Sequence, residues 1–213
     1  MSRLMHSVCA VIVAGAVWAA PISTVMAGPP QLSAGDKSRL TSWKAVIKVD
    51  KSSPYWVPTA MLLFSQRPEQ VMSVVMDISK YDKYMPKVAQ SRVVRRKGKH
   101  RIWAVIVTSL PWPLRNAWVA VRYDWSVIGP HAYRLSWVRE RGSMRRYWGR
   151  LDLYPWGRYW TLAVCTMQAE PDENISRSRL NGGIVWGTEQ LLQHLRQRVD
   201  SMQRLGLLRW WQP

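Results

Sequence analysis

The sequence predicts an α+β fold in which one curved antiparallel sheet packs against a long C-terminal helix. Between Val88 and Met167, apolar and aromatic residues alternate with polar ones, and short segments rich in turn residues separate the alternating runs. Short links between consecutive strands favour antiparallel pairing. From Ile184 to Met202 the apolar residues adopt helical spacing instead. With 213 residues, the chain is long enough for one domain with a substantial core.

Three elements are expected before the main sheet. Leu40–Asp50 and Val57–Ser65 read as extended segments, separated by a Ser-Ser-Pro turn. A helix follows, because Pro68 suits a first helical position and Glu69 suits the helix dipole there. The apolar stripe of this helix consists of Val71, Val74, Val75 and Ile78.

Six strands are expected in the main sheet. They are Val88–Arg96, Arg101–Thr108, Ala117–Val127, Tyr133–Arg139, Met144–Leu153 and Tyr159–Met167. Their alternation predicts one apolar face with large rings and one mixed face. Because a shift of one residue moves every side chain of a strand to the opposite face, the register decides which residues point inward.

The last element is expected to be a long amphipathic helix that begins near Asn181 and ends before Gly206. Its apolar stripe is Ile184, Thr188, Leu191, Leu195, Val199 and Met202. The glycines at 182, 183 and 187 fit helix initiation and close packing better than a phosphate-binding loop. This helix is the element of the second half that is able to cover the apolar face of the sheet.

Residues 1–27 read as a signal peptide. Arg3 supplies a short positive region, an uncharged apolar run follows, and Val25–Ala27 presents small residues at the usual cleavage positions. We therefore expect an exported, periplasmic protein, which stays anchored in the membrane if the leader is not cleaved.

The remaining residues divide into three parts. Residues 28–39 are expected to form a tether, 40–206 the folded domain and 207–213 an apolar tail. Two alternatives remain open for the tail: it packs back on the domain, or it places Trp210 and Trp211 at a membrane interface.

The net charge of +18 favours an anionic partner. Nucleic acid and anionic membrane surfaces both fit this charge, but export argues against nucleic acid, and a solvated basic surface without a partner is the alternative. Arginines that alternate with aromatic residues suit phosphate contacts and base stacking. The segment with this pattern contains Arg139, Arg141, Arg145, Arg146, Arg150 and Arg158, with Tyr147 and Trp148.

Signals for catalysis or metal binding are weak. The histidines at 100, 131 and 194 lack the spacing of metal ligands. Cys165 is the one cysteine beyond the leader, so no internal disulfide is expected, and its apolar strand predicts a small buried side chain. We expect no metal, no cofactor and no catalytic residue.

The order of motifs resembles the START-like (SRPBCC) helix-grip superfamily, which includes START lipid-transfer domains, coenzyme Q-binding START proteins and polyketide cyclases. The resemblance covers Trp56–Arg204 and depends on Val74–Pro86 (VVMDISKYDKYMP), Ser91–Val93, Pro111–Pro113, Gly149–Leu151 and the closing helix. It implies a sheet that wraps the helix and leaves a cavity for an apolar guest, such as a lipid, sterol, quinone or polyketide.

Three functions are therefore weighed. The leading hypothesis is non-enzymatic binding or transport of a hydrophobic ligand in the cell envelope, the second a cyclase-like or aromatase-like enzyme that uses the same cavity, and the third a basic polyanion-binding protein. The cavity is expected to open at Pro111, Trp112 and Pro113. Its expected wall consists of Trp103, Val119, Val121, Tyr123, Tyr133, Leu135, Trp137, Trp160, Leu162, Ile184, Leu191 and Leu195. The alternative is that the large rings fill this space and leave no cavity.

Overall fold

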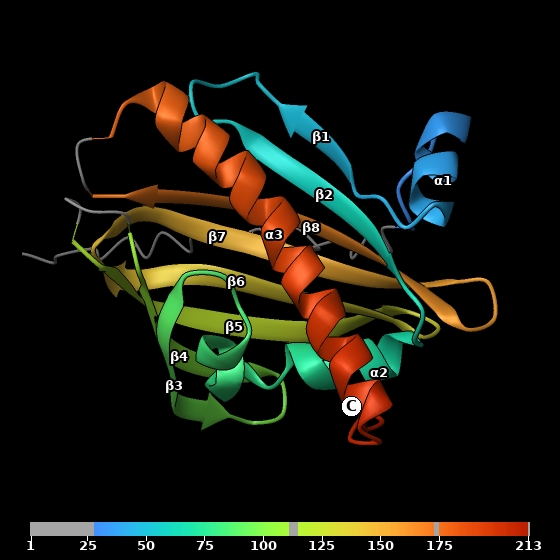
Figure 1. The fold of residues 1–213 in the computed structure, drawn as a ribbon. Coiled ribbons are helices and arrows are strands. Elements are labelled where there is room, and N and C mark those ends of the chain that lie inside the picture. The colour runs from blue at the N-terminus through green and yellow to red at the C-terminus, as the bar shows by residue number, and fades with distance from the viewer. Residues whose placement is uncertain (1–27, 111–114, 173–174, 213) are drawn as a thin grey trace, which may run out of the picture.

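An antiparallel sheet of eight strands curves around one long helix (Figure 1). The computed structural model describes residues 28–110, 115–172 and 175–212. The strands are β1 (Val46–Asp50), β2 (Val57–Phe64), β3 (Val88–Lys97), β4 (Arg101–Thr108), β5 (Ala117–Gly129), β6 (Ala132–Gly142), β7 (Met144–Trp156) and β8 (Trp160–Pro171). The helices are α1 (Ala34–Thr41), α2 (Pro68–Val75), the 3₁₀ helix η1 (Ile78–Lys83) and α3 (Arg177–Arg204). The α+β helix-grip architecture expected from the sequence is confirmed.

The strand order β1-β2-β8-β7-β6-β5-β4-β3 brings the last strand back beside the second. β3 to β8 form the expected meander of neighbouring antiparallel pairs, and β8 also pairs with β2. The expected signal peptide lies outside the described residues. Among the described residues, no helix is long and apolar enough to cross a membrane.

Helix α3 lies in the concave side of the sheet over 28 residues. It begins at Arg177, four positions before the expected start at Asn181. It ends as expected: Gly206 adopts a φ of 68°, and its backbone N–H donates to the carbonyl of Gln203. Glycine tolerates this left-handed conformation at a helix C-terminus better than other residues.

Helix α1 corrects part of the expected tether at 28–39. Ser33 caps this helix: its hydroxyl accepts from the backbone N–H of Asp36, whose carboxylate in turn accepts from the backbone N–H of Ser33. Leu40 at its last turn is fully buried against the outer face of the sheet, in a cluster with Val46 and Leu162. The sheet is therefore covered on both faces around β1, β2 and β8. For this reason β8 has buried apolar residues on its outer face as well as on its inner face.

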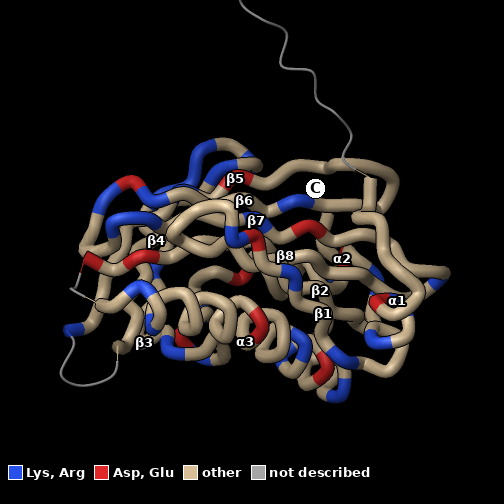
Figure 2. The backbone as a smooth tube through the Cα atoms, turned by 90° about the horizontal axis from the view of Figure 1, so that it is seen from above, with Lys and Arg blue, Asp and Glu red and all other residues tan. Residues whose placement is uncertain are grey.

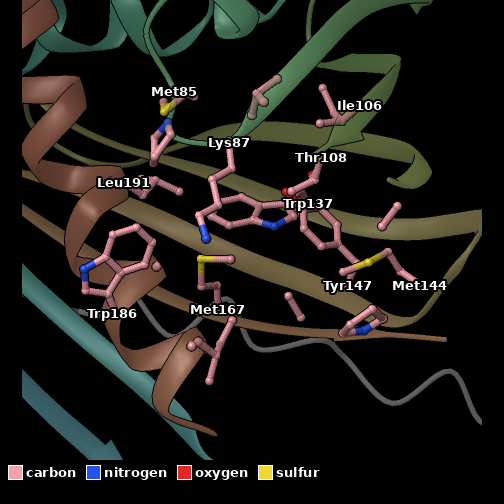
Figure 3. Close-up of a pocket in the computed structure, with 18 of the residues that line it drawn as sticks. Met85, Lys87, Ile106, Thr108, Trp137, Met144, Tyr147, Met167, Trp186 and Leu191 are labelled. Atoms are coloured by element: carbon pink, nitrogen blue, oxygen red, sulfur yellow. The ribbon is translucent and has the colours of Figure 1, made fainter. Parts of the chain in front are cut away.

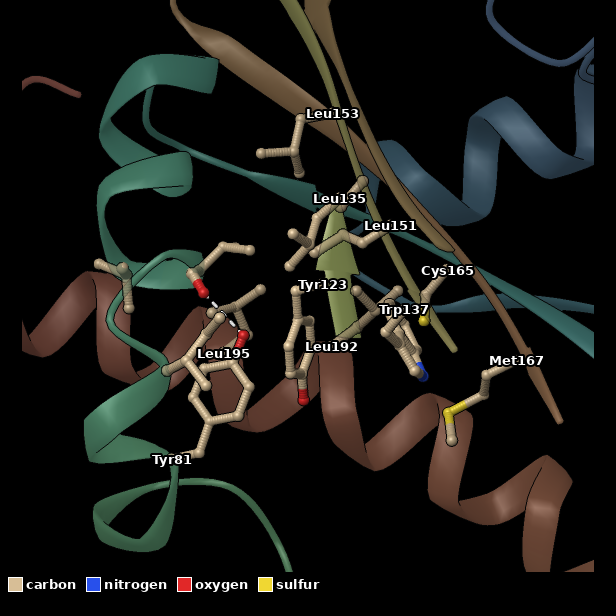
Figure 4. Packing of buried hydrophobic residues seen from close by; sticks show 14 of the residues in the cluster. Tyr81, Tyr123, Leu135, Trp137, Leu151, Leu153, Cys165, Met167, Leu192 and Leu195 are labelled. Atoms are coloured by element: carbon tan, nitrogen blue, oxygen red, sulfur yellow. Dashed lines mark hydrogen bonds between the residues drawn. The ribbon is translucent and has the colours of Figure 1, made fainter. Parts of the chain in front are cut away.

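The C-terminal half of α3 and helix α2 fill one end of the concave side. Leu192 and Val199 are fully buried against the sheet, and Figure 4 shows Leu192 among the packed side chains of the core. Side chains packed at this density leave no room for a guest. This region is the closed end of the molecule.

The C-terminal tail covers the closed end. The Trp211 ring contacts Trp125 with a centroid distance of 4.4 Å and Tyr133 with one of 5.1 Å, both edge to face. Its backbone N–H donates to the carbonyl of Glu69. Packing back on the domain is therefore the alternative that holds for Trp211, whereas Trp210 is 56% exposed.

Candidate ligand-binding cavity

A cavity of about 880 Å³ separates the sheet from the N-terminal half of α3 (Figure 3). Its walls come from the inner faces of β5 to β8, from α3 up to Leu195, from the end of β4 and from the η1–β3 connection at 85–87. The alternative in which indole rings fill this space is wrong. The volume lies in the range of ligand-binding clefts in proteins.

The wall is mainly apolar and contains several flexible side chains. Met85, Met144 and Met167 line the cavity together with Trp186 and Leu191 (Figure 3). Methionine has an unbranched, polarizable side chain that adapts to irregular apolar surfaces. Such a wall is suited to ligands whose shape varies along their length.

Four residues of the sheet with a hydrogen-bonding side chain also line the cavity. They are Thr108, Tyr123, Trp137 and Tyr147. Burial raises the pKa of Tyr147 to about 12, and burial also raises the pKa of Tyr123, with a further contribution from the nearby Tyr147. Both hydroxyls therefore stay protonated at neutral pH and act as hydrogen-bond donors.

Trp137 keeps its place because its cross-strand neighbour is Gly149. A Cβ atom at position 149 would lie 2.4 Å from Cζ2 of Trp137 and 2.8 Å from the Cβ of Met167. Contacts this short do not occur between real side chains, so a glycine is required there. The glycine thereby lets the indole lie flat on β7 at the edge of the cavity.

Two cations lie on the cavity wall. Lys87 extends from the η1–β3 connection into the cavity, with its Nζ 5.1 Å from the ring centroid of Trp186 on α3 (Figure 3). Arg179 lines the cavity from the first turn of α3. No Asp or Glu side chain lines the cavity in the described part of the chain. The potential inside is therefore positive.

Six residues of the expected wall line the cavity: Tyr123, Leu135, Trp137, Ile184, Leu191 and Leu195. Three others, Val119, Val121 and Tyr133, are buried in the same core cluster but outside the cavity lining. The Tyr133 hydroxyl instead donates to Oε1 of Glu69 over 3.0 Å at the closed end. The expected residues of β5 and β6 all lie on the inner face of the sheet. Their position along the strand decides whether they line the cavity or pack at the closed end.

The structure places Trp103, Trp160 and Leu162 on the opposite face of the sheet, which corrects their expected position. The Trp103 indole N–H donates to Glu140 over 2.9 Å. Trp160 is 38% exposed, and Leu162 is buried under α1. In β4 and β8 the outward residues are as apolar as the inward ones. The alternation of polarity therefore did not show which side of these strands faces the helix.

The expected mouth residues Pro111, Trp112 and Pro113 lie outside the described residues. Leu110 and Ala117, which flank this segment, both line the cavity. The position of the mouth therefore remains a prediction at these three residues.

Sequence reasoning missed several wall residues, chiefly Met85, Lys87, Tyr147, Met167 and Trp186. Tyr147 was assigned to the basic surface segment, yet it shares a strand face with Leu151, which is two positions beyond Gly149. The pattern Tyr-x-Gly-x-Leu was a usable signal for an inward face. Lys87 and Met85 lie in a connection, where no periodicity indicates direction.

The glycines of α3 do not serve close packing, which corrects that expectation. A Cβ atom at Gly182, Gly183 or Gly187 would meet nothing within 4 Å. Gly183 and Gly187 line the cavity. Because glycine inside a helix costs about 0.5–1 kcal/mol relative to alanine, these positions lower stability and enlarge the cavity.

The arginine segment contacts acids and carbonyls of its own sheet. Arg145 pairs with Asp172 over 2.8 Å, Arg146 with Glu170 over 3.6 Å, and Arg139 donates to the carbonyl of Gly142. Lys and Arg residues are distributed over many elements, on α3 as well as on the strands (Figure 2). The charge is thus not gathered in this segment.

Residues with metal-binding or nucleophilic chemistry were also located. In the described ranges, no group of three or more His, Cys, Asp or Glu side chains is placed to hold a metal ion. Cys165 is fully buried, as expected, and burial raises the pKa of its thiol to about 12. The thiol is therefore protonated and packs as an apolar group.

Comparison with known proteins identifies the fold. No protein-family model and no curated protein matches the chain. A STAR-related lipid transfer protein from Xanthomonas axonopodis superposes with a TM-score of 0.64 at 19% identity, covering 74% of this chain and 93% of that one. Human STARD10 gives 0.62 at 11% identity, with coverages of 82% and 84%. A START superfamily protein from Mycobacterium smegmatis gives 0.57 at 13% identity, with coverages of 68% and 98%. The chain has the helix-grip fold of START-like domains.

Proposed function

We propose that this protein binds a hydrophobic small molecule or lipid between the sheet and α3, and carries or senses it without converting it. The observation that supports this most strongly is the cavity of about 880 Å³ with its apolar wall. The similar structures from Xanthomonas axonopodis and from human STAR-related lipid transfer protein 5 carry lipid transfer in their names. At 19% and 8% identity, these likenesses show the fold alone, and the cavity supplies the argument for binding.

The energetics favour a ligand with a large apolar surface. Burial of apolar surface contributes about 25 cal/mol per Å², whereas association costs roughly 4–15 kcal/mol in lost freedom. A ligand must therefore bury several hundred Å² to bind at all. Lipid-sized molecules meet this requirement, and small metabolites do not.

We further propose that the protein works in the cell envelope and takes its ligand from an anionic membrane. The leader-like sequence at 1–27 supports export. Trp186 is 47% exposed and lies beside Lys87 at the cavity, a combination that suits the headgroup region of a bilayer. Sedimentation with anionic and neutral vesicles tests this: we expect retention by the anionic vesicles, lost at high salt, and equal retention by both contradicts it.

Native mass spectrometry of protein purified without detergent tests the binding proposal. We expect a one-to-one adduct in the lipid mass range that organic solvent removes. The extracted molecule is then identified and offered back to the stripped protein. Recovery of the same mass indicates a carrier, and recovery of an altered mass indicates the cyclase-like alternative. Protein that carries no adduct and takes up no lipid from vesicles contradicts the proposal.

A further inference from the structure

The donors on the cavity wall form a strip across neighbouring strands. Tyr123 on β5 is the cross-strand partner of Trp137 on β6, which is the partner of Gly149 on β7. Tyr147 precedes Gly149 by two positions and so points to the same side of β7. We call Tyr123, Trp137 and Tyr147 the donor strip.

The donor strip lacks acceptors within the described residues. The Trp137 indole N–H is buried with no hydrogen-bond partner, and the hydroxyls of Tyr123 and Tyr147 form no hydrogen bond there. Tyr123 is 3% exposed and Trp137 is 7% exposed. A buried donor without a partner costs about 1–3 kcal/mol. The Trp137 N–H is such a group, and the Tyr123 and Tyr147 hydroxyls beside it are able to donate to a molecule in the cavity.

Two nearby tyrosines show what satisfied hydroxyls look like in this molecule. The Tyr81 hydroxyl donates to the carbonyl of Val75 over 2.7 Å, the contact drawn in Figure 4, and Tyr84 donates to the carbonyl of Val74 over 3.0 Å. Both bonds fasten η1 to α2. Tyr123 and Tyr147 line the cavity instead, so an acceptor for their hydroxyls comes from a molecule inside it, either water or a ligand.

The cations of the cavity have no acidic partner within the described ranges. Lys87 and Arg179 form no ion pair among the described residues, whereas Arg134 pairs bidentately with the buried Asp152 over 2.6 and 2.8 Å. Lys87 also holds a left-handed backbone conformation with a φ of 58°. This conformation is unfavourable for residues other than glycine, and backbone strain of this kind is frequent at ligand-binding sites.

We infer that the cavity selects an amphipathic anion, namely an apolar body that ends in a carboxylate or phosphate. This inference rests on the proposed function. The acidic oxygens accept hydrogen bonds from the donor strip and pair with Lys87, while the apolar body fills the space along α3. The hydroxyls of Thr108 and Ser176 complete the polar lining and accommodate either acid. Charged hydrogen bonds of this kind are stronger than neutral ones.

The test compares ligands of one chain length that differ in the head. Palmitic acid, methyl palmitate and hexadecanol are titrated into the stripped full chain by displacement of a fluorescent fatty probe. We expect palmitic acid to bind about tenfold more tightly than the two neutral ligands. Palmitoyl lysophosphatidic acid is titrated beside palmitic acid, and the tighter ligand shows whether the preferred head is a phosphate or a carboxylate. Palmitoyl lysophosphatidylcholine, whose head carries no net charge, is the control for the phosphate.

Variants connect the preference to the named groups. Lys87→Met should abolish the preference for the acid, while Lys99→Met, at an exposed lysine outside the cavity lining, should keep it. Tyr123→Phe keeps the ring and removes one donor, so we expect about fivefold weaker binding of the acid and unchanged binding of hexadecanol. Melting temperatures of all three variants should match that of the parent chain, and Tyr147→Phe replaces Tyr123→Phe if the latter melts early.

The outcomes separate this inference from the proposed function. Equal affinity for palmitic acid, its ester and its alcohol overturns the inference and leaves a hydrophobic carrier. A preference that survives Lys87→Met and Tyr123→Phe also overturns it. If no lipid binds and no adduct is found, the proposed function fails together with the inference.

Discussion

The two halves of α3 face the same sheet, but one packs tightly against it and the other is separated from it by the cavity. In the C-terminal half, Leu192 and Val199 are fully buried outside the cavity lining. In the N-terminal half, Gly183 and Gly187 face the cavity, and Trp186 is nearly half exposed. The helix is continuous from Arg177 to Arg204, so the backbone does not create this difference. Side-chain size along one helix determines where the molecule is solid and where it is hollow.

This contrast also separates stability from binding. The closed end holds the contacts of α2, the C-terminal tail and the second half of α3, whereas the open end holds the unpartnered donors and cations. We therefore expect substitutions at the closed end to change the free energy of unfolding. Substitutions at the open end should change ligand affinity instead.

The largest expected effect is on stability at the closed end. Leu192→Ala removes a fully buried side chain, and such changes cost about 2–5 kcal/mol of unfolding free energy. Leu191→Ala is the matched change one position earlier, at a residue that lines the cavity, and we expect a loss below about 1.5 kcal/mol. Urea unfolding of both variants measures the difference. Equal losses would remove the distinction between the side of α3 that packs on the sheet and the side that lines the cavity.

The next effect is on binding at the open end. Gly187→Leu places a side chain into the cavity, and we expect lipid affinity to fall at least about tenfold, or ~1.4 kcal/mol. The melting temperature should not fall, because leucine favours the helix more than glycine does. Gly182→Leu is the control, since Gly182 does not line the cavity. If both variants bind as the parent chain does, the ligand lies elsewhere.

The third effect concerns pH at the closed end. Burial would raise the pKa of Glu69, but hydrogen bonds from His131 and Tyr133 outweigh it and lower the pKa below the ordinary 4.5. A carboxylate with a lowered pKa in the folded state stabilises the fold above pH 4.5, and this contribution is lost as the pH falls through the folded-state value. We expect Glu69→Gln to cost about 1 kcal/mol near neutral pH.

Urea unfolding of the parent chain and of Glu69→Gln, from neutral pH to below pH 4.5, measures how the loss of unfolding free energy depends on pH. The difference between the two proteins should shrink below pH 4.5. Tyr133→Phe removes one of the two donors to Glu69 and should show part of the same behaviour. A difference that is constant down to the lowest pH would show that Glu69 does not titrate in this way.

The smallest effect is a gain in stability at the open end. Gly183→Ala adds a methyl group where nothing lies within 4 Å, so the helix gains about 0.5–1 kcal/mol without a clash. For a chain of this size, that gain raises the melting temperature by roughly 2–4 °C. Calorimetry of the ligand-free protein measures it. A lower melting temperature would mean that this glycine is needed for packing.

Most of the fold could be predicted from the sequence because the outer face of the central strands is polar. In β5, Arg122 and Asp124 alternate with Val121 and Tyr123, and the pattern fixed both the strand and its inward side. Helix α1 was missed because its capping residues, Ser33 and Asp36, follow a Pro/Gly-rich stretch that resembles a linker.

The site was only partly readable, for a physical reason. Alternation shows which face is buried, but it does not show whether a buried side chain meets another side chain or an open space. Val121 and Tyr123 share one face of β5, yet Tyr123 alone of the two lines the cavity. The hollow results from residues that are small, such as Gly187, and from connections such as the one that carries Lys87. Neither has a periodic signature.

The central claim is that the space beside the N-terminal half of α3 belongs to a ligand. A crystal structure of the purified chain grown with palmitic acid tests it most directly. We predict continuous density for one elongated molecule between α3 and Tyr123, Trp137 and Tyr147, with its polar end near Lys87. A structure in which α3 has closed onto the sheet, with Met167 and Trp186 filling the space and no ligand inside, would contradict the account.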